Sequence, residues 1–306
     1  MNKISLLAFV WLLFTSGLGP AEGADKVSGY LYEDTRQLIA LVEDAASLIE
    51  QRGESAFHEF GVEGSRWLGG QRYVFIYDLG GSCVFHPAEP GLVGQNLMGL
   101  VDLDGRPVVA MITDVGKRPE ADASGWVFYL WEEQPNSLVP SWKGSYVRKA
   151  VAPDGTVYLV GSGLHNPKME RTFLQEHVDR AAHLVLTHGR VDAFEALRHR
   201  SSPLHLLDTY ITVMDSRGNL VVDPSFPTLA KQRSFASFRD KSGRAPYAEI
   251  TEGLKSTDRT WVSYIWPKGN LGRMARHLMY VRKVVADGEL FYVSGTYVPA
   301  MPVWMK

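Results

Sequence analysis

The chain has 306 residues, which is enough for about two domains of ordinary size. Hydrophobic residues make up 45% and charged residues 22%, a composition that is typical of folded globular proteins and excludes a disordered chain. The formal net charge of −2 and the pI near 6.5 leave no surplus of basic residues for phosphate groups, so we expect no nucleic-acid partner. Cys83 is the single cysteine, and we expect it to be a buried strand residue.

The first 23 residues have the pattern of a signal peptide. Lys3 precedes a short apolar stretch, Ile4–Phe14, and small residues follow up to Gly23. The apolar stretch is too short to span a bilayer comfortably, which favours cleavage after Gly23 over an uncleaved anchor. We therefore expect an exported, periplasmic protein whose mature part begins near Ala24.

One helix and a series of strands are expected between residues 30 and 164. Apolar residues recur at three- and four-residue steps from Tyr30 to Arg52, which predicts an amphipathic helix, and a short helical piece follows at 54–60. The period then changes to that of strands, with a glycine-containing turn between the first two. The expected strands are Tyr73–Tyr77, Cys83–His86 and residues 126–132, 142–152 and 156–164.

The same order of elements returns in the second half of the chain. A helix is expected at Met169–Leu197, and Tyr280-Val281-Arg282-Lys283 repeats Tyr146-Val147-Arg148-Lys149 letter for letter. Tyr210, Trp261 and Tyr280 follow Tyr73, Trp126 and Tyr146 by 137, 135 and 134 residues. A period of this length indicates domain duplication rather than a solenoid. We call residues 25–165 the first repeat and residues 167–300 the second repeat, with Pro167 expected in the first turn of the second helix.

The landmarks of the first repeat resemble those of a known family. The helix, the segments "YVFIYDLGGSCVFHPAEPGLVGQNL", "GWVFYLW" and "KGSYVRK", and the strand "VGSG" are similar to the single Cache domain, type 2, of bacterial extracytoplasmic sensors. The resemblance covers residues 30–165 well and 168–298 more loosely. It implies an α+β fold of two tandem PAS-like Cache domains, each with a long N-terminal helix packed on an antiparallel sheet. It also implies a pocket for a small metabolite, often a short carboxylate.

Six residues of the first repeat are candidates for ligand contact. An ammonium group is rarely buried without an anion, and the resemblance places Lys143 near the pocket. A solvated strand edge is the alternative for Lys143. His86 ends a strand, where it could donate to a carboxylate or cap the loop that follows. The aromatic residues alternate along their strands, so that one face meets the helix and the other lines the pocket. The pattern leaves open which face is which, and core packing is the alternative for the aromatic residues. The candidates are His86, Trp126, Tyr129, Trp131, Lys143 and Tyr146.

Three positions of the second repeat differ from these candidates and their neighbours. Asp223 stands opposite His86, His277 opposite Lys143, and Arg233 opposite Asn96. The second repeat is therefore not expected to bind the same ligand, and an empty pocket, a different ligand and a docking role all stay open.

Motifs of catalysis are absent from the sequence. It contains no G-x-S-x-G elbow, H-E-x-x-H helix or P-loop, so we expect no enzyme, no cofactor and no metal site. The interpretation that follows is a periplasmic sensor protein that binds a small organic acid and acts through a separate membrane chemoreceptor, kinase or transporter. The alternative is a structural protein in which both Cache folds have lost their ligands and kept only protein contacts.

Overall fold

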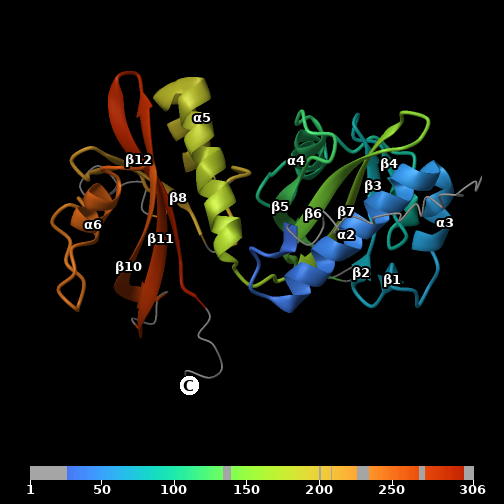
Figure 1. Cartoon of the computed structure of the whole chain (residues 1–306), viewed down its shortest axis with the longest axis horizontal. Helices are drawn as coiled ribbons and strands as arrows, with labels where there is room; N and C mark the ends of the chain where they lie inside the picture. The colour runs from blue at the N-terminus through green and yellow to red at the C-terminus, as the bar shows by residue number, and fades with distance from the viewer. Residues whose placement is uncertain are drawn as a thin grey trace, which may run out of the picture.

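The computed structural model describes residues 26–133, 139–199, 201–207, 209–225, 234–268 and 273–299. The expected signal peptide and Arg233 lie outside these described residues. Within the described ranges, no helix is long and apolar enough to cross a membrane. Two five-stranded sheets lie side by side, and the helix α5 (Arg171–Arg198) lies between them (Figure 1).

The first sheet has the strand order β4-β3-β7-β6-β5, and all its neighbouring strands are antiparallel. Its strands are β3 (Phe75–Asp78), β4 (Cys83–Phe85), β5 (Ser124–Trp131), β6 (Ser141–Val151) and β7 (Val157–His165). These bounds agree closely with those expected from the alternation of side chains, except that β3 begins after Tyr73. Tyr73 instead belongs to a separate two-stranded pair, β1 (Leu68–Gly69) and β2 (Arg72–Tyr73).

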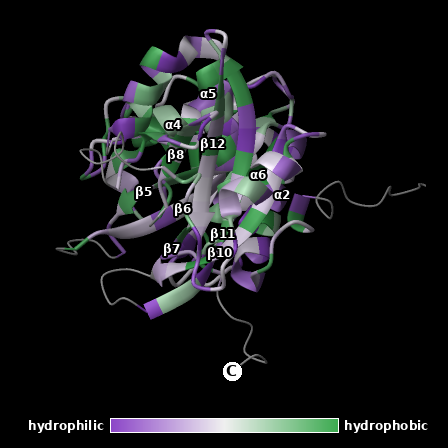
Figure 2. Cartoon of the chain, turned by 90° about the vertical axis from the view of Figure 1, so that its left-hand side faces the viewer, coloured by the Kyte–Doolittle hydropathy of each residue, from purple (hydrophilic) through white to green (hydrophobic). Residues whose placement is uncertain are grey.

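The helix α2 (Glu33–Arg52) covers one face of this sheet because its apolar side chains recur on one side. Leu38, Val42, Ala45 and Ile49 have no exposed surface, and α2 carries hydrophilic as well as hydrophobic residues along its length (Figure 2). The short helices η1 (Gly53–Ala56) and α3 (Phe57–Phe60) continue the chain after α2. The predicted amphipathic helix over residues 30–52 is therefore confirmed.

The opposite face of the first sheet carries a helix that the sequence patterns did not predict. This helix, α4 (Val108–Gly116), has nine residues, seven of them buried, so it lacks the polar stripe by which an amphipathic helix is recognised. A short helix, η2 (Pro90–Leu92), lies in the loop between β4 and α4. The side chain of Asn96 ties this loop to the β3–β4 turn by donating to the carbonyl oxygen of Gly80 over 2.8 Å.

The second sheet repeats this topology. Its order is β10-β11-β12-β8-β9, with α5 on one face and α6 (Pro246–Gly253) on the other. Its strands are β8 (Ile211–Asp215), β9 (Leu220–Val222), β10 (Arg259–Lys268), β11 (Arg273–Ala286) and β12 (Glu289–Tyr297). The helix α5 changes direction at Gly189, whose φ of 74° lies in the left-handed region that glycine tolerates. Because α5 begins at Arg171, Pro167 lies in the connection before the helix and not in its first turn.

Equivalent residues occupy equivalent places in the two sheets. Trp126 on β5 pairs with Tyr146 on β6, and Trp261 on β10 pairs with Tyr280 on β11. Both tryptophans thus lie on the edge strand of their sheet, as a duplication requires.

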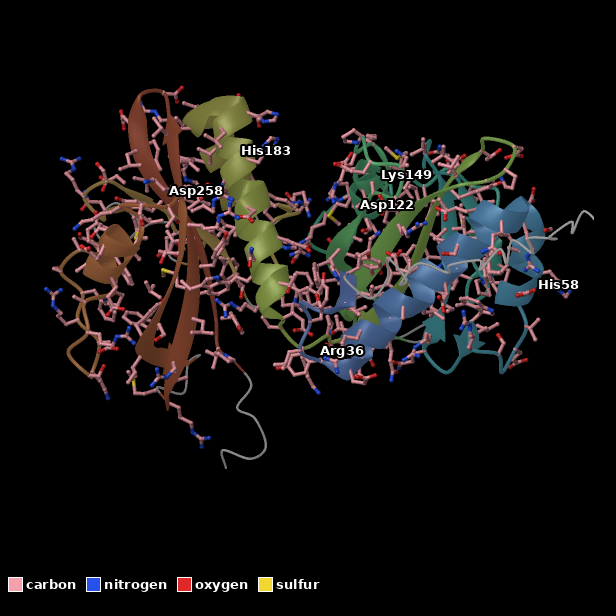
Figure 3. The ribbon with its side chains drawn as sticks, viewed as in Figure 1. Arg36, His58, Asp122, Lys149, His183 and Asp258 are labelled. Carbon is pink, nitrogen blue, oxygen red and sulfur yellow. The ribbon has the colours of Figure 1, made fainter. Side chains whose placement is uncertain are left out.

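Equivalent ion pairs also fasten each helix to its sheet. Arg148 of β6 binds Glu43 of α2 over 2.8 Å, and Arg282 of β11 binds Asp179 of α5 over 2.7 Å. Arg282 binds Asp258 as well, which is labelled in Figure 3. The matching pairs explain why the four-residue segment around each arginine is repeated, and they give both arginines a structural role.

The first turns of α5 also pack against the first repeat. The ring of Phe173 lies 4.7 Å from that of Trp126 and 5.8 Å from that of Tyr30. The carboxylate of Glu170, which is 1% exposed, accepts hydrogen bonds of 2.8 Å from the backbone N–H groups of Leu31 and Tyr32. One helix therefore contributes to the core of its own repeat and to that of its neighbour.

Candidate functional site

The two faces of the first sheet divide the six candidate residues into two groups. In an antiparallel pair, directly opposed residues point to the same face, and successive residues alternate. Tyr129 and Lys143 oppose each other, as do Trp126 and Tyr146, so these two pairs lie on opposite faces. The face that carries Lys143 is the one that α4 covers, since Tyr129 packs in the same core cluster as the residues of α4.

Trp126 and Tyr146 lie against the helical face, away from Lys143. The indole Nε1 of Trp126 donates to the hydroxyl of Tyr30 over 3.0 Å, and the hydroxyl of Tyr146 donates to Glu43 of α2 over 2.8 Å. Both side chains are almost fully buried. The structure therefore places these two candidates in the core between sheet and helix, and it does not bring them together with the other four.

Lys143 is the centre of a polar cluster that also contains Tyr73, His86, Tyr129 and Ser145. Its side chain is 2% exposed, and its Nζ donates to the hydroxyl of Tyr73 over 2.6 Å and lies 4.6 Å from the centroid of that ring. Burial lowers the pKa of Lys143 from 10.5 to about 8, since a charged group is disfavoured away from water. The ammonium form still predominates at neutral pH.

A glycine makes room for the lysine. A Cβ atom at Gly163 of β7 would lie 2.5 Å from Cε of Lys143 and 2.7 Å from Oγ of Ser145, both too close for van der Waals contact. Gly163 opposes Ser145 in the sheet, and its neighbour His165 opposes Lys143. Glycine at position 163 therefore leaves the space that the side chain of Lys143 occupies.

His86 supplies a neutral hydrogen-bond donor next to this lysine. Its Nδ1 accepts the backbone N–H of Glu89 over 2.9 Å, so that the proton of the neutral ring resides on Nε2. Burial, together with the charge of Lys143, lowers the pKa of His86 to about 4. The ring lies 5.0 Å from that of Tyr73 and stacks on Phe75 at 6.2 Å.

Tyr129 and Trp131 border the cluster from the edge strand β5. The hydroxyl of Tyr129 is hydrogen-bonded to Oγ of Ser145 over 2.8 Å. Its ring meets the half-buried Trp131 edge-on, with centroids 5.7 Å apart. These two residues combine apolar surface with a polar tip, as small-molecule sites commonly do.

A cavity of about 400 Å³ adjoins the polar cluster. It is lined by Gly163 and His165, the β7 residues that face Ser145 and Lys143, and by Arg66 and Arg72 from the first two-stranded pair and the loop before it. Burial, followed by the charge of Lys143, lowers the pKa of His165 to about 4. Permanent positive charge therefore lies both inside the cluster and beside it.

A buried ammonium group beside neutral hydrogen-bond donors is chemically suited to holding an anion. No carboxylate of the described residues forms an ion pair with Lys143, although Glu89 is near enough to raise its pKa slightly. Among the same residues, no group of three histidine, cysteine or acidic side chains is placed to hold a metal ion. Cys83, the free thiol, is buried, and burial raises its pKa to about 11.

Tyr73 is the member of the cluster that the sequence patterns missed. The alternation of side chains predicts Tyr73 at the start of the strand Tyr73–Tyr77, where it resembles an ordinary aromatic residue of the core. The signal that could have identified it is its position at the start of the repeated segment, since Tyr210 occupies the same place in the second repeat.

The first repeat thus combines an antiparallel sheet, a long helix on one face and a buried cationic cluster on the other. Residues 61–165 match the family model of the Cache domain. This segment of the chain is therefore similar to Cache domains.

Several proteins that are similar to part of this chain come from chemotaxis. The methyl-accepting chemotaxis protein McpP of Pseudomonas putida is 31% identical over 104 residues, which are 34% of this chain and 18% of that protein. The chain thus spans less than a fifth of the length of this curated relative. A solved periplasmic sensor domain of a chemotaxis protein is 30% identical, covering 42% of this chain and 92% of its own, with a TM-score of 0.35. A Cache chemosensory domain solved for its recognition of carboxylic acids is 25% identical, covering 44% and 94%, also with a TM-score of 0.35.

Proposed function

We propose that the first repeat reversibly binds a small organic carboxylate, which Lys143 holds together with Tyr73 and His86. The observation that carries this proposal is the 2% exposed ammonium group of Lys143, which has no ion-pair partner among the described side chains. A buried charge without a counter-ion is unfavourable, and an anionic ligand would supply the missing partner.

The neighbouring groups support an anion over a cation. Lys143 is a charged donor, the Nε2–H of His86 is a neutral donor, and the hydroxyl of Tyr73 already accepts from Lys143, so its proton is available to the ligand. Phe75 and Trp131 add apolar surface beside these donors. A short carboxylate matches both features, because its two oxygens accept hydrogen bonds from the donors and its apolar body packs against the aromatic surface.

The same proposal includes the route of the signal. The matched family is one of sensor domains, and we propose that this chain is exported by its N-terminal segment and that a separate membrane receptor or transporter recognises its ligand-bound form. The mature N-terminus of the exported protein, measured by mass spectrometry, tests the export step. Ligand-dependent cross-linking to a membrane protein tests the second step.

Calorimetry tests the ligand class. Residues 25–306 are titrated with acetate, propionate, pyruvate and succinate, and with propionamide as the uncharged isostere of propionate. A charge-assisted hydrogen bond contributes about 1.5–3 kcal/mol, so Lys143→Ala should weaken carboxylate binding about 10–150-fold. Lys149→Ala is the matched control, because Lys149 lies on the same strand and its Nζ binds the backbone oxygens of Arg118 and Glu120 outside the cluster.

The pH dependence of binding gives a second test. Only the ammonium form of Lys143 attracts a carboxylate, and the pKa of the ligand-free lysine is about 8. The dissociation constant should therefore be constant from mildly acidic to neutral pH and then rise about tenfold per pH unit above pH 8. A dissociation constant that does not change above pH 8, or equal binding of propionamide and propionate, would exclude Lys143 as the carboxylate ligand and favour a role in protein contacts alone.

A further inference from the structure

The cavity beside the polar cluster extends the first site toward the β1–β2 pair. Its volume of about 400 Å³ lies within the usual range for small-molecule sites and exceeds what a three-carbon carboxylate requires. Gly163 lines it on the side of the lysine, and a Cβ atom at this glycine would lie 2.5 Å from Cε of Lys143. The side chain of Lys143 therefore lies at the edge of the cavity, and an anionic group in the cavity would be close to the first site.

The walls of the cavity carry positive charge. Arg66 and Arg72 line it, and none of its described lining residues is acidic. The segments that form these walls, residues 65–72 and 163–165, are described without a gap. Ser141, at the start of β6, is hydrogen-bonded to the lining residue His165 over 3.0 Å, and residues 134–138, which precede β6 in the chain, include no acidic residue. The two arginines therefore set the charge of the cavity.

The two arginines differ in whether their charge is already paired. Arg66 binds the carboxylate of Asp44 over 2.7 Å and lies 4.1 Å from the ring centroid of Trp67, so its charge is compensated at the surface. Arg72 is half-buried, and its side chain forms no ion pair or hydrogen bond with any residue that the structure describes. The guanidinium of Arg72 therefore keeps its N–H donors available to a ligand in the cavity.

The short strand β2 connects the cavity to the polar cluster, because Arg72 and Tyr73 are its two residues. The hydroxyl of Tyr73 accepts from Lys143 over 2.6 Å, and its backbone oxygen accepts from Oγ of Ser162 over 2.7 Å. Ser162 lies on β7 next to Gly163, so this bond fixes β2 against the sheet at the edge of the cavity. The backbone of Arg72 is therefore held in a defined place relative to the buried ammonium group.

We propose that the ligand of the first repeat is a dicarboxylate, an inference that rests on the proposed function of Lys143. One carboxylate is bound by Lys143, Tyr73 and His86, and the other is bound by Arg72 in the cavity. A guanidinium presents two parallel N–H donors that match the two oxygens of a carboxylate. A monocarboxylate of the same length would leave this guanidinium unpaired and would place an apolar end beside it.

Calorimetry on residues 25–306 with ligands of matched length tests this proposal. Malonate, succinate and glutarate are each compared with the monoamide in which an uncharged carboxamide replaces one carboxylate. We expect at least one diacid to bind at least tenfold more tightly than its monoamide. Arg72→Gln should weaken this diacid at least tenfold and leave the affinity for propionate unchanged, which also shows that the variant is folded. Arg52→Gln is the control, since Arg52 of the same repeat is paired with Glu59 and should not affect either ligand.

The results separate this inference from the proposed function. If propionate binds and Lys143→Ala weakens it, but every diacid binds no more tightly than its monoamide, the proposed function stands and the dicarboxylate is overturned. The dicarboxylate is also overturned if Arg72→Gln keeps the full preference for the diacid. If neither propionate nor any diacid binds at millimolar concentration, both proposals fail. Arg72→Lys, which keeps the charge but not the paired donors, should retain part of the preference that Arg72→Gln loses.

Discussion

The replacement Lys143→Met separates the cost of burying the lysine from its use in binding. Methionine retains most of the side-chain volume and removes the charge. Burial lowers the pKa of Lys143 from 10.5 to about 8, and one pKa unit corresponds to about 1.4 kcal/mol, so the buried charge destabilises the ligand-free protein by about 3 kcal/mol at neutral pH. Replacing the lysine removes this destabilisation. It also removes the 2.6 Å hydrogen bond to Tyr73 and the contact with its ring, which costs about 1–2 kcal/mol.

At neutral pH and without ligand, the free energy of unfolding of the variant should therefore be about 1–2 kcal/mol higher than that of the unmodified chain. The sign reverses with pH. Because the pKa in the folded state lies below that in the unfolded state, the unfolded chain binds more protons between about pH 8 and about pH 10.5, and the unmodified protein gains stability as the pH rises through this interval. The difference should shift by about 2–3 kcal/mol between neutral pH and about pH 10, so that the variant is by then the less stable of the two proteins.

Urea unfolding followed by tryptophan fluorescence measures both values, with the transition of the first repeat analysed separately if the two repeats unfold in steps. Lys149→Met is the control, because this lysine of the same strand reaches the surface of the first repeat (Figure 3) and its removal should produce no comparable gain. If Lys143→Met is less stable than the unmodified chain by the same free energy at neutral pH and at about pH 10, burial of the lysine does not destabilise the ligand-free protein.

Three further predictions concern neighbouring parts of the first repeat. Gly163→Ala should leave the fold intact and weaken carboxylate binding at least tenfold, because the new Cβ would displace Lys143, which calorimetry detects. Tyr146→Phe should lower the free energy of unfolding by about 1 kcal/mol through loss of the bond to Glu43 and leave carboxylate binding unchanged, as shown by urea unfolding and calorimetry on one sample. Phe173→Ala should destabilise the first repeat as well as the second, by about 3–5 kcal/mol in total, which scanning calorimetry detects as a shift of both transitions.

Each of these predictions has an outcome that contradicts it. The control for Gly163→Ala is Gly91→Ala, where a Cβ would meet no atom within 4 Å, and equal affinities of the two variants would place Lys143 outside the site. Loss of binding in Tyr146→Phe would mean that the ligand lies on the helical face of the sheet. If Phe173→Ala shifts a single transition, the two repeats are not energetically coupled through α5.

The sequence by itself predicted the first helix and the five long strands of the first repeat, and the return of a similar series of elements in the second half of the chain. The alternation of side chains predicted the strands, and the apolar period predicted α2, because both patterns are local consequences of backbone geometry. The repeated arginine segment has a structural basis, since Arg148 and Arg282 form equivalent ion pairs with their helices. The helix α4 escaped prediction because burial on nearly all sides removes the polar stripe on which such prediction depends.

Only the tertiary structure decided which side chains meet. Alternation shows that Tyr129 and Trp126 point to opposite faces, yet both faces of a sheet covered by helices are apolar, so the pattern cannot tell the helix side from the ligand side. The position of Tyr73 beside Lys143 depends on a contact between residues 70 positions apart in the chain. In the second repeat, aromatic contacts likewise join Phe235 and Phe238, which precede α6, to strand β10, and only folding creates such proximity.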